Sequence, residues 1–115
     1  MPQHNSIRNR IILLIKNGNF STKFSRKRPN EWRPERVRNP SGTFFSEFTE
    51  ESAWELIMEL LEKGHPIEPI TLKKPPGAKG YVMKVELEPN TPKLYIKLEL
   101  GNIVFGRSFH YSDWS

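Results

Sequence analysis

The amino-acid sequence predicts a single α+β domain, residues 1–115, in which a small antiparallel sheet of three to five strands has two helices packed on one face. Residues 81–88 and 94–111 alternate apolar and polar side chains, which is typical of half-buried strands. Residues 7–17 and 49–63 instead repeat apolar side chains with the period of an amphipathic helix. A chain of 115 residues forms one domain with a modest core.

The first predicted helix covers residues 7–17. Ser6 is expected to be its N-cap, and Gly18 occupies the position at which helices commonly end. Three prolines interrupt the residues that follow, so a regular helix or central strand is not expected there. We therefore predict an irregular, basic, proline-rich loop at about 21–42, with Trp32 as its large anchor.

The second predicted helix covers residues 49–63. Thr49 is its expected N-cap, and Gly64 follows its last turn. Its apolar stripe is interpreted as core, and its row of glutamates as a solvated face. The stripe contains Ala53, Trp54, Ile57, Leu60 and Leu61, and the acidic row contains Glu51, Glu55, Glu59 and Glu62.

Four further segments are expected to be extended. Residues 43–48 form a short strand or lead-in, and residues 67–72 a short strand broken by a proline. The 81–88 strand precedes a hairpin at 94–111, whose tight turn is predicted at Gly101 and Asn102. Alternation places four polar side chains on one face of this hairpin: Tyr95, Lys97, Ser108 and His110.

The net charge of +5 is concentrated in one segment. Residues 23–38 hold seven basic side chains and two acidic ones, whereas the rest of the chain has eleven of each. This concentration favours a polyanionic partner, either nucleic acid or an acidic protein; a solvated loop without a partner is the alternative. The basic side chains are Lys23, Arg26, Lys27, Arg28, Arg33, Arg36 and Arg38.

Several classes of site are disfavoured. The chain lacks cysteine, so disulfides, thiolate zinc sites and cysteine nucleophiles are excluded. Its three histidines are not spaced as metal ligands, and no nucleotide-binding glycine motif is present, so neither metal nor cofactor is expected. The longest apolar run is too short for a membrane span, and we expect a cytoplasmic protein.

The remaining chemistry is a metal-independent phosphodiester site on the hairpin. RNA is cleaved without a metal when its 2′-hydroxyl attacks the adjacent phosphate, which requires a base, an acid and cations. An imidazole titrates near neutral pH, so His110 is the candidate acid or base. Lys97 and Arg107 are candidate phosphate ligands, and Tyr95 offers a hydroxyl or a ring for stacking. Strict alternation puts Arg107 on the apolar face, unless Gly106 marks a bulge.

Three pieces of the sequence, in this order and spacing, resemble the mRNA-cleaving toxins of the motility quorum-sensing regulator (MqsR) type. They are ILLIKNGNFSTKFSR, FTEESAWELI and LYIKLEL…GRSFH. This family belongs to the RelE-like superfamily of bacterial toxin–antitoxin systems. The resemblance implies a RelE-like fold, endoribonuclease activity on mRNA, and neutralisation by an acidic antitoxin.

Carried over by position, the family's tyrosine falls on Tyr95, the lysine two residues later on Lys97, and the final-strand lysine on His110. The sequence also departs from the family pattern. The family's helix lysine falls near Glu55, its catalytic glutamine has no counterpart because Gln3 is the only glutamine, and residues 75–77 are an insertion.

The sequence thus predicts a toxin-like endoribonuclease whose partners are RNA and an acidic antitoxin. A non-catalytic module of the same fold that binds nucleic acid or an acidic protein through basic and aromatic side chains is the alternative. An accessory subunit of a larger complex is a third interpretation. The aromatic candidates are Trp32, Phe44, Phe45 and Tyr95.

Overall fold

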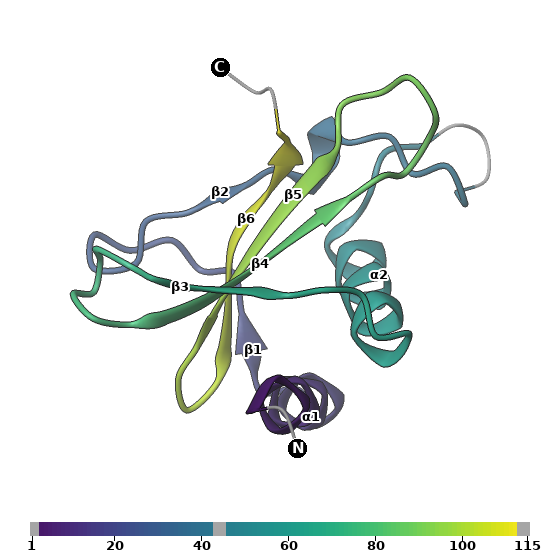
Figure 1. Cartoon of the computed structure of the whole chain (residues 1–115). Helices are drawn as coiled ribbons and strands as arrows, with labels where there is room; N and C mark the ends of the chain where they lie inside the picture. The colour runs from purple at the N-terminus through teal and green to yellow at the C-terminus, as the bar shows by residue number, and fades with distance from the viewer. Residues whose placement is uncertain (1–2, 43–45, 113–115) are drawn as a thin grey trace.

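The structure is a computed structural model that describes residues 3–42 and 46–112, and it confirms the α+β class (Figure 1). Two helices accompany a six-stranded mixed sheet that is mostly antiparallel. The strand order is β1-β6-β5-β4-β3, with β2 also paired to β6. The elements are α1 (Gln3–Lys16), β1 (Phe20–Ser21), β2 (Glu31–Trp32), the 3-10 helix η1 (Pro34–Arg36), α2 (Glu50–Glu62), β3 (Glu68–Thr71), β4 (Lys79–Val85), β5 (Leu94–Leu100) and β6 (Val104–Tyr111).

The second helix has the predicted boundaries, whereas the first begins earlier than expected. Thr49 caps α2 through a reciprocal capping box with Ser52, in which each side chain bonds the other residue's backbone N–H. Helix α1 already includes residues 3–5, so the prediction of Ser6 as its N-cap was wrong. The end of α1 was predicted correctly, because Gly18 follows with a φ of 76°, a conformation that suits glycine.

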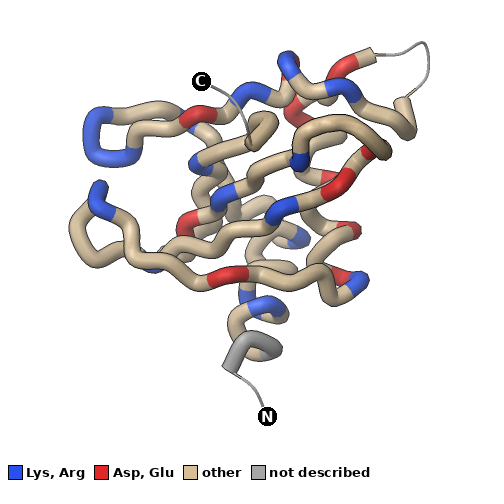
Figure 2. The backbone as a smooth tube through the Cα atoms, turned by 45° about the horizontal axis from the view of Figure 1, so that its top comes forward, with Lys and Arg blue, Asp and Glu red and all other residues tan. Residues whose placement is uncertain are grey.

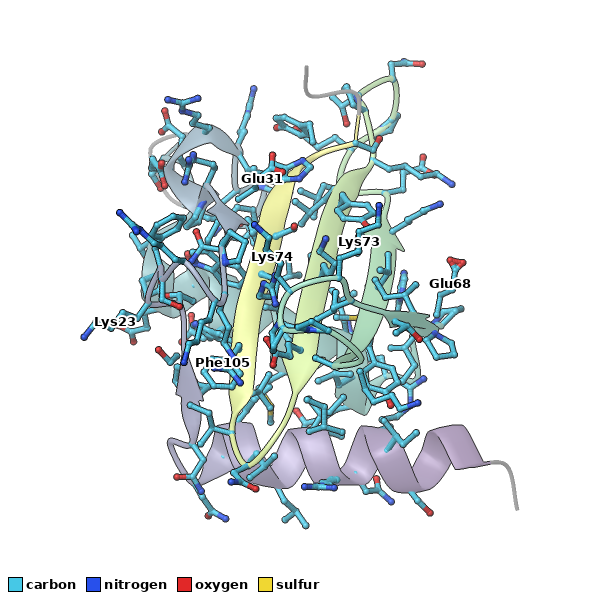
Figure 3. The ribbon with its side chains drawn as sticks, turned by 90° about the vertical axis from the view of Figure 1, so that its left-hand side faces the viewer. Lys23, Glu31, Glu68, Lys73, Lys74 and Phe105 are labelled. Carbon is cyan, nitrogen blue, oxygen red and sulfur yellow. The ribbon has the colours of Figure 1, made fainter. Side chains whose placement is uncertain are left out.

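The core lies between the sheet and the helices. On β5, Leu94, Ile96 and Leu98 are buried on the helix side, as the period-two pattern predicted. Phe109 on β6 is fully buried and contacts the ring of Phe48 edge-on, at 5.2 Å between centroids. In Figure 1, α2 lies to the right of the sheet and α1 lies below it, and Figure 3 shows that no helix of the described residues covers the opposite face of the sheet.

The basic loop contains two short strands that the sequence did not predict. Strands β1 and β2 both run parallel to β6 and pair with different parts of it. Trp32 anchors this segment as predicted: it is buried and stacks on Trp54 with 5.2 Å between ring centroids. Glu50 accepts hydrogen bonds from both indole N–H groups and from Thr22, so α2 holds the loop at both ends.

The turn of the hairpin is one residue longer than predicted. Leu100 pairs with Val104, so Ile103 belongs to the turn and not to the returning strand. Residues 43–45 of the strand predicted at 43–48 lie outside the described residues, and Glu47, in the described half, forms only an isolated bridge with Arg38. In the described part of the chain, neither helix has the length and apolar character needed to cross a membrane.

Candidate nucleic-acid site

The face of the sheet opposite the helices is crossed by a row of aligned side chains, one from each of five strands. The strand registers align Glu31 on β2, Ser108 on β6 and Lys97 on β5. The same row continues through Val82 on β4 to Glu68 on β3. Figure 3 views this face directly, with Glu31 and Glu68 at its two sides. The row therefore sets a lysine between two carboxylates that the sequence separates by tens of residues.

A β-bulge brings Arg107 onto this face. The register between β5 and β6 shifts after Lys97, so Ser108 pairs with Lys97 but Gly106 pairs with Leu98, and Arg107 is the extra residue. The bulge that was considered at this position is thus present, and Arg107 does not point into the core with Phe109. Bulges commonly redirect a side chain next to a functional site.

A buried ion cluster fixes the orientation of Arg107. Its Nη1 donates to Glu99 Oε1 at 2.8 Å, and its Nε donates to the carbonyl oxygen of Pro29 at 2.8 Å. Arg28 reaches the same carboxylate through Nε, at 3.1 and 3.2 Å from the two oxygens, and its guanidinium lies 4.2 Å from the centroid of the Phe105 ring. Glu99 is only 2 % exposed, and the two arginines compensate its charge. Two members of the predicted nucleic-acid set therefore also have a structural role.

A small pocket opens beside this cluster. Its volume is about 160 Å³, comparable with a few water molecules or one phosphate group. Two basic side chains, one hydroxyl and one carboxylate contribute to its wall, so it can hold an anion and also accept a proton. The lining residues are Pro29, Asn30, Glu31, Lys97, Arg107 and Ser108.

The pKa values of two residues on this face are shifted by their surroundings. Burial lowers the pKa of Lys97 from its ordinary value of 10.5, and the positive charge of Arg107 lowers it further, while Glu31 acts in the opposite direction. An anion bound between these two cations would relieve that repulsion. Burial raises the pKa of Tyr95, and the negative charges of Glu68 and Glu31 add to the effect. Tyr95 therefore stays protonated at neutral pH and can donate a hydrogen bond but cannot serve as a base.

His110 and Tyr95 form a second row next to the pocket. They are paired across β5 and β6, and their rings stack with 5.5 Å between centroids. The Nδ1 atom of His110 lies 2.8 Å from the carbonyl oxygen of Tyr111, which can only accept, so Nδ1 carries a proton. In the neutral ring Nε2 is then the nitrogen able to accept a proton. His110 follows Ser108 by two residues on one strand, so their Cα atoms are about 7 Å apart.

Two basic loops border the open face. Residues 22–30 form a loop closed by the Asn30 side chain, which donates to the carbonyl oxygen of Thr22 at 2.8 Å. The loop between β3 and β4 carries Lys73 and Lys74, both exposed. Figures 1 and 2 show the two loops next to each other on one side of the sheet, and Figure 3 shows the lysine loop in front of it. The pocket therefore lies on a face with positive charge along its border.

The seven basic residues predicted as one set are divided between two places. Within the loop of residues 22–30, Lys23, Arg26 and Lys27 are exposed, and Arg28 is half-buried. The other three lie further along the chain, near the end of β6. The backbone N–H of Arg33 donates to Phe109, and that of Arg38 donates to the Tyr111 hydroxyl; Arg36 lies between them in η1.

Sequence reasoning missed three residues of this site. Glu31 is brought to the pocket by β2, a two-residue strand without a recognisable pattern. Lys73 and Lys74 lie in a turn for which the sequence predicted no role, and no sequence signal indicates which face a turn approaches. In contrast, the ring of Trp32, a candidate for stacking on bases, is buried and not accessible. Phe44 and Phe45 lie outside the described residues.

No group of three or more histidine, aspartate or glutamate side chains within residues 3–42 and 46–112 is close enough to hold a metal ion.

No protein-family model matches the chain, and searches against curated proteins and solved structures gave no significant match. The resemblance to MqsR-type toxins therefore depends on the sequence patterns alone and remains a prediction.

Proposed function

We propose that the open face of the sheet binds RNA and cleaves it without a metal ion. The observation that supports this most directly is the convergence of Lys97 and Arg107 with Glu31 and Ser108 on one pocket, beside the stacked pair of His110 and Tyr95. Two cations suit a phosphodiester, and a carboxylate with an imidazole suits the transfer of two protons. Such an arrangement needs no group that the chain does not supply.

The proposed reaction is a transesterification within the RNA. The 2′-oxygen attacks the adjacent phosphorus, the bond from phosphorus to the 5′-oxygen breaks, and a 2′,3′-cyclic phosphate and a 5′-hydroxyl result. Glu31 takes the proton from the 2′-hydroxyl, and protonated His110 gives a proton to the leaving 5′-oxygen. Lys97 and Arg107 stabilise the charge that develops on the phosphate oxygens, and Tyr95 donates a hydrogen bond or stacks on a base.

The two neighbouring basic loops would bind the RNA backbone on one side of the scissile phosphate. The exposed side chains of Lys23, Arg26 and Lys27, with Lys73 and Lys74 on the neighbouring loop, suit contacts to the backbone that carry no sequence information. An acidic protein that covers the same face would block the site, as proposed for an antitoxin. Cleavage of mRNA would place the protein in the cytoplasm.

The test is cleavage of a mixed-sequence RNA by the purified protein in excess EDTA, with His110→Ala, Glu31→Gln and Lys97→Met in parallel. The matched control is His65→Ala, since His65 makes the same Nδ1 contact with the next residue's carbonyl, at 2.9 Å, but does not line the pocket. We expect each of the three variants to lose at least tenfold in rate and the control to cleave normally.

Cleavage that survives in all three variants would refute this assignment. If the wild-type protein binds RNA in a salt-dependent manner but never cleaves it, including in the presence of ribosomes, the non-catalytic module is correct instead. Loss of cleavage in EDTA with recovery on adding a divalent cation would refute the metal-free mechanism alone.

A further inference from the structure

The exposed side of α2 forms an acidic groove with an apolar floor, on the helix side of the molecule. Eight residues of the groove come from α2 and its C-cap, in pairs that recur every four residues along the helix, so the groove follows the whole helix. Its volume is about 870 Å³. The lining residues are Ile15, Phe20, Glu50, Glu51, Trp54, Glu55, Met58, Glu59, Glu62 and Lys63.

The floor of the groove is apolar without being closed. Phe20 and Met58 are half-buried, and the Phe20 ring lies against Trp54 with 4.5 Å between centroids. Because Phe20 and Met58 are partly exposed, an apolar side chain of another molecule can pack on them.

The rim has a strong negative charge, although the chain as a whole is basic. It holds five glutamates and one lysine. Glu59 is paired with Lys63 at 2.6 Å, and Glu62 lies 3.7 Å from Lys16. Among the described residues, Glu51 and Glu55 have no ion pair, and Glu50 accepts hydrogen bonds only from uncharged groups.

We propose that this groove binds a basic amphipathic segment of a partner protein, with apolar side chains on the floor and lysine or arginine against the glutamates. Helix α2 has 13 residues, which corresponds to about 20 Å, and a partner helix of three to four turns matches this length. The charge of the rim excludes nucleic acid and disfavours an acidic partner. The site is therefore separate from the open face and does not depend on the function proposed for it.

The test uses a synthetic, fluorescently labelled peptide of about 14 residues, with leucines along one helical face and lysines elsewhere, and measures its binding by anisotropy at physiological salt. Control peptides have the same residues in scrambled order, or glutamate in place of lysine. We expect Glu51→Lys/Glu55→Lys and Met58→Gln each to weaken peptide binding at least tenfold. The control variant Glu35→Lys/Glu86→Lys has the same change in net charge as the double groove variant, at exposed sites outside the groove, and should bind the peptide as the wild type does.

An equal loss in the control variant, or equally tight binding of the scrambled or acidic peptide, would overturn the proposal. Sedimentation of the protein alone provides a further check. Self-association that disappears in Glu51→Lys/Glu55→Lys would identify a second copy of this chain as the occupant and would also overturn it. Unchanged far-UV circular dichroism in each variant establishes that the fold is retained.

Discussion

Replacing Glu99 by leucine is expected to destabilise the protein more than most single substitutions. The change removes the acceptor of both arginines and leaves the guanidinium of Arg107, whose side chain is 7 % exposed, with the Pro29 carbonyl as its remaining partner. Breaking a buried ion pair on one side costs about 3–5 kcal/mol. Arg28 is 35 % exposed, so water replaces most of what it loses, and its share adds about 1 kcal/mol at most.

Urea denaturation followed by tryptophan fluorescence provides the measurement, because Trp32 and Trp54 are stacked in the core. With an m-value of about 1.5 kcal/mol/M, a loss of about 4 kcal/mol lowers the midpoint by about 2–3 M urea. The double variant Glu99→Leu/Arg107→Leu should recover most of this loss, since it removes both buried charges. A single variant within about 1 kcal/mol of the wild type, or a double variant no more stable than the single one, would refute the reasoning.

Three further predictions concern single side chains. Gly106→Ala should lower the unfolding free energy by about 1–3 kcal/mol in the same assay, because a Cβ atom there would lie 2.7 Å from a ring carbon of Trp32; an unchanged midpoint would contradict that contact. Thr49→Ala should cost about 1 kcal/mol through loss of the α2 cap, and wild-type stability would show that the capping box contributes nothing. Lys97→Met should weaken RNA binding without lowering the melting temperature at neutral pH. Folding lowers the pKa of Lys97, so the protonated lysine opposes folding. This cost in stability disappears only as the pH rises toward 10.5. Because the pKa of Lys97 is lowered, RNA binding by the wild-type protein should weaken at a lower pH than the ordinary lysine pKa of 10.5 predicts. If RNA binding by Lys97→Met shows the same dependence on alkaline pH, Lys97 is not the cause.

The elements that could be predicted from the sequence are those whose signal is local. Period-two alternation identified β4, β5 and β6 and placed Tyr95, Lys97 and His110 on one face, because side-chain direction along a strand depends only on the backbone. The α2 boundaries followed from Thr49 and the glycine after its last turn. These predictions did not depend on which elements pack against each other in the tertiary structure.

The features that were missed depend on tertiary contacts. Strands β1 and β2 have two residues each, too few to show a period, and exist because β6 offers them a partner. The bulge that redirects Arg107 is stabilised by Glu99, Pro29 and the close approach of Trp32 to Gly106, none of which the local pattern reveals. The side chains of the long strands could therefore be assigned to the proposed site from the sequence, whereas Glu31, Lys73 and Lys74 could not, because tertiary contacts bring them there.

The way the sheet ends has a consequence for the behaviour of the protein at high concentration. Long unpaired edge strands are templates for pairing between molecules, and proteins protect them with proline, charge or short length. Here β3, at one end of the sheet, has four residues including Pro69 and the exposed Glu68, and at the other end β6 is covered by β1 and β2 with two residues each. Intermolecular strand addition is disfavoured on both sides, so a molecule with this much β structure is expected to resist ordered aggregation.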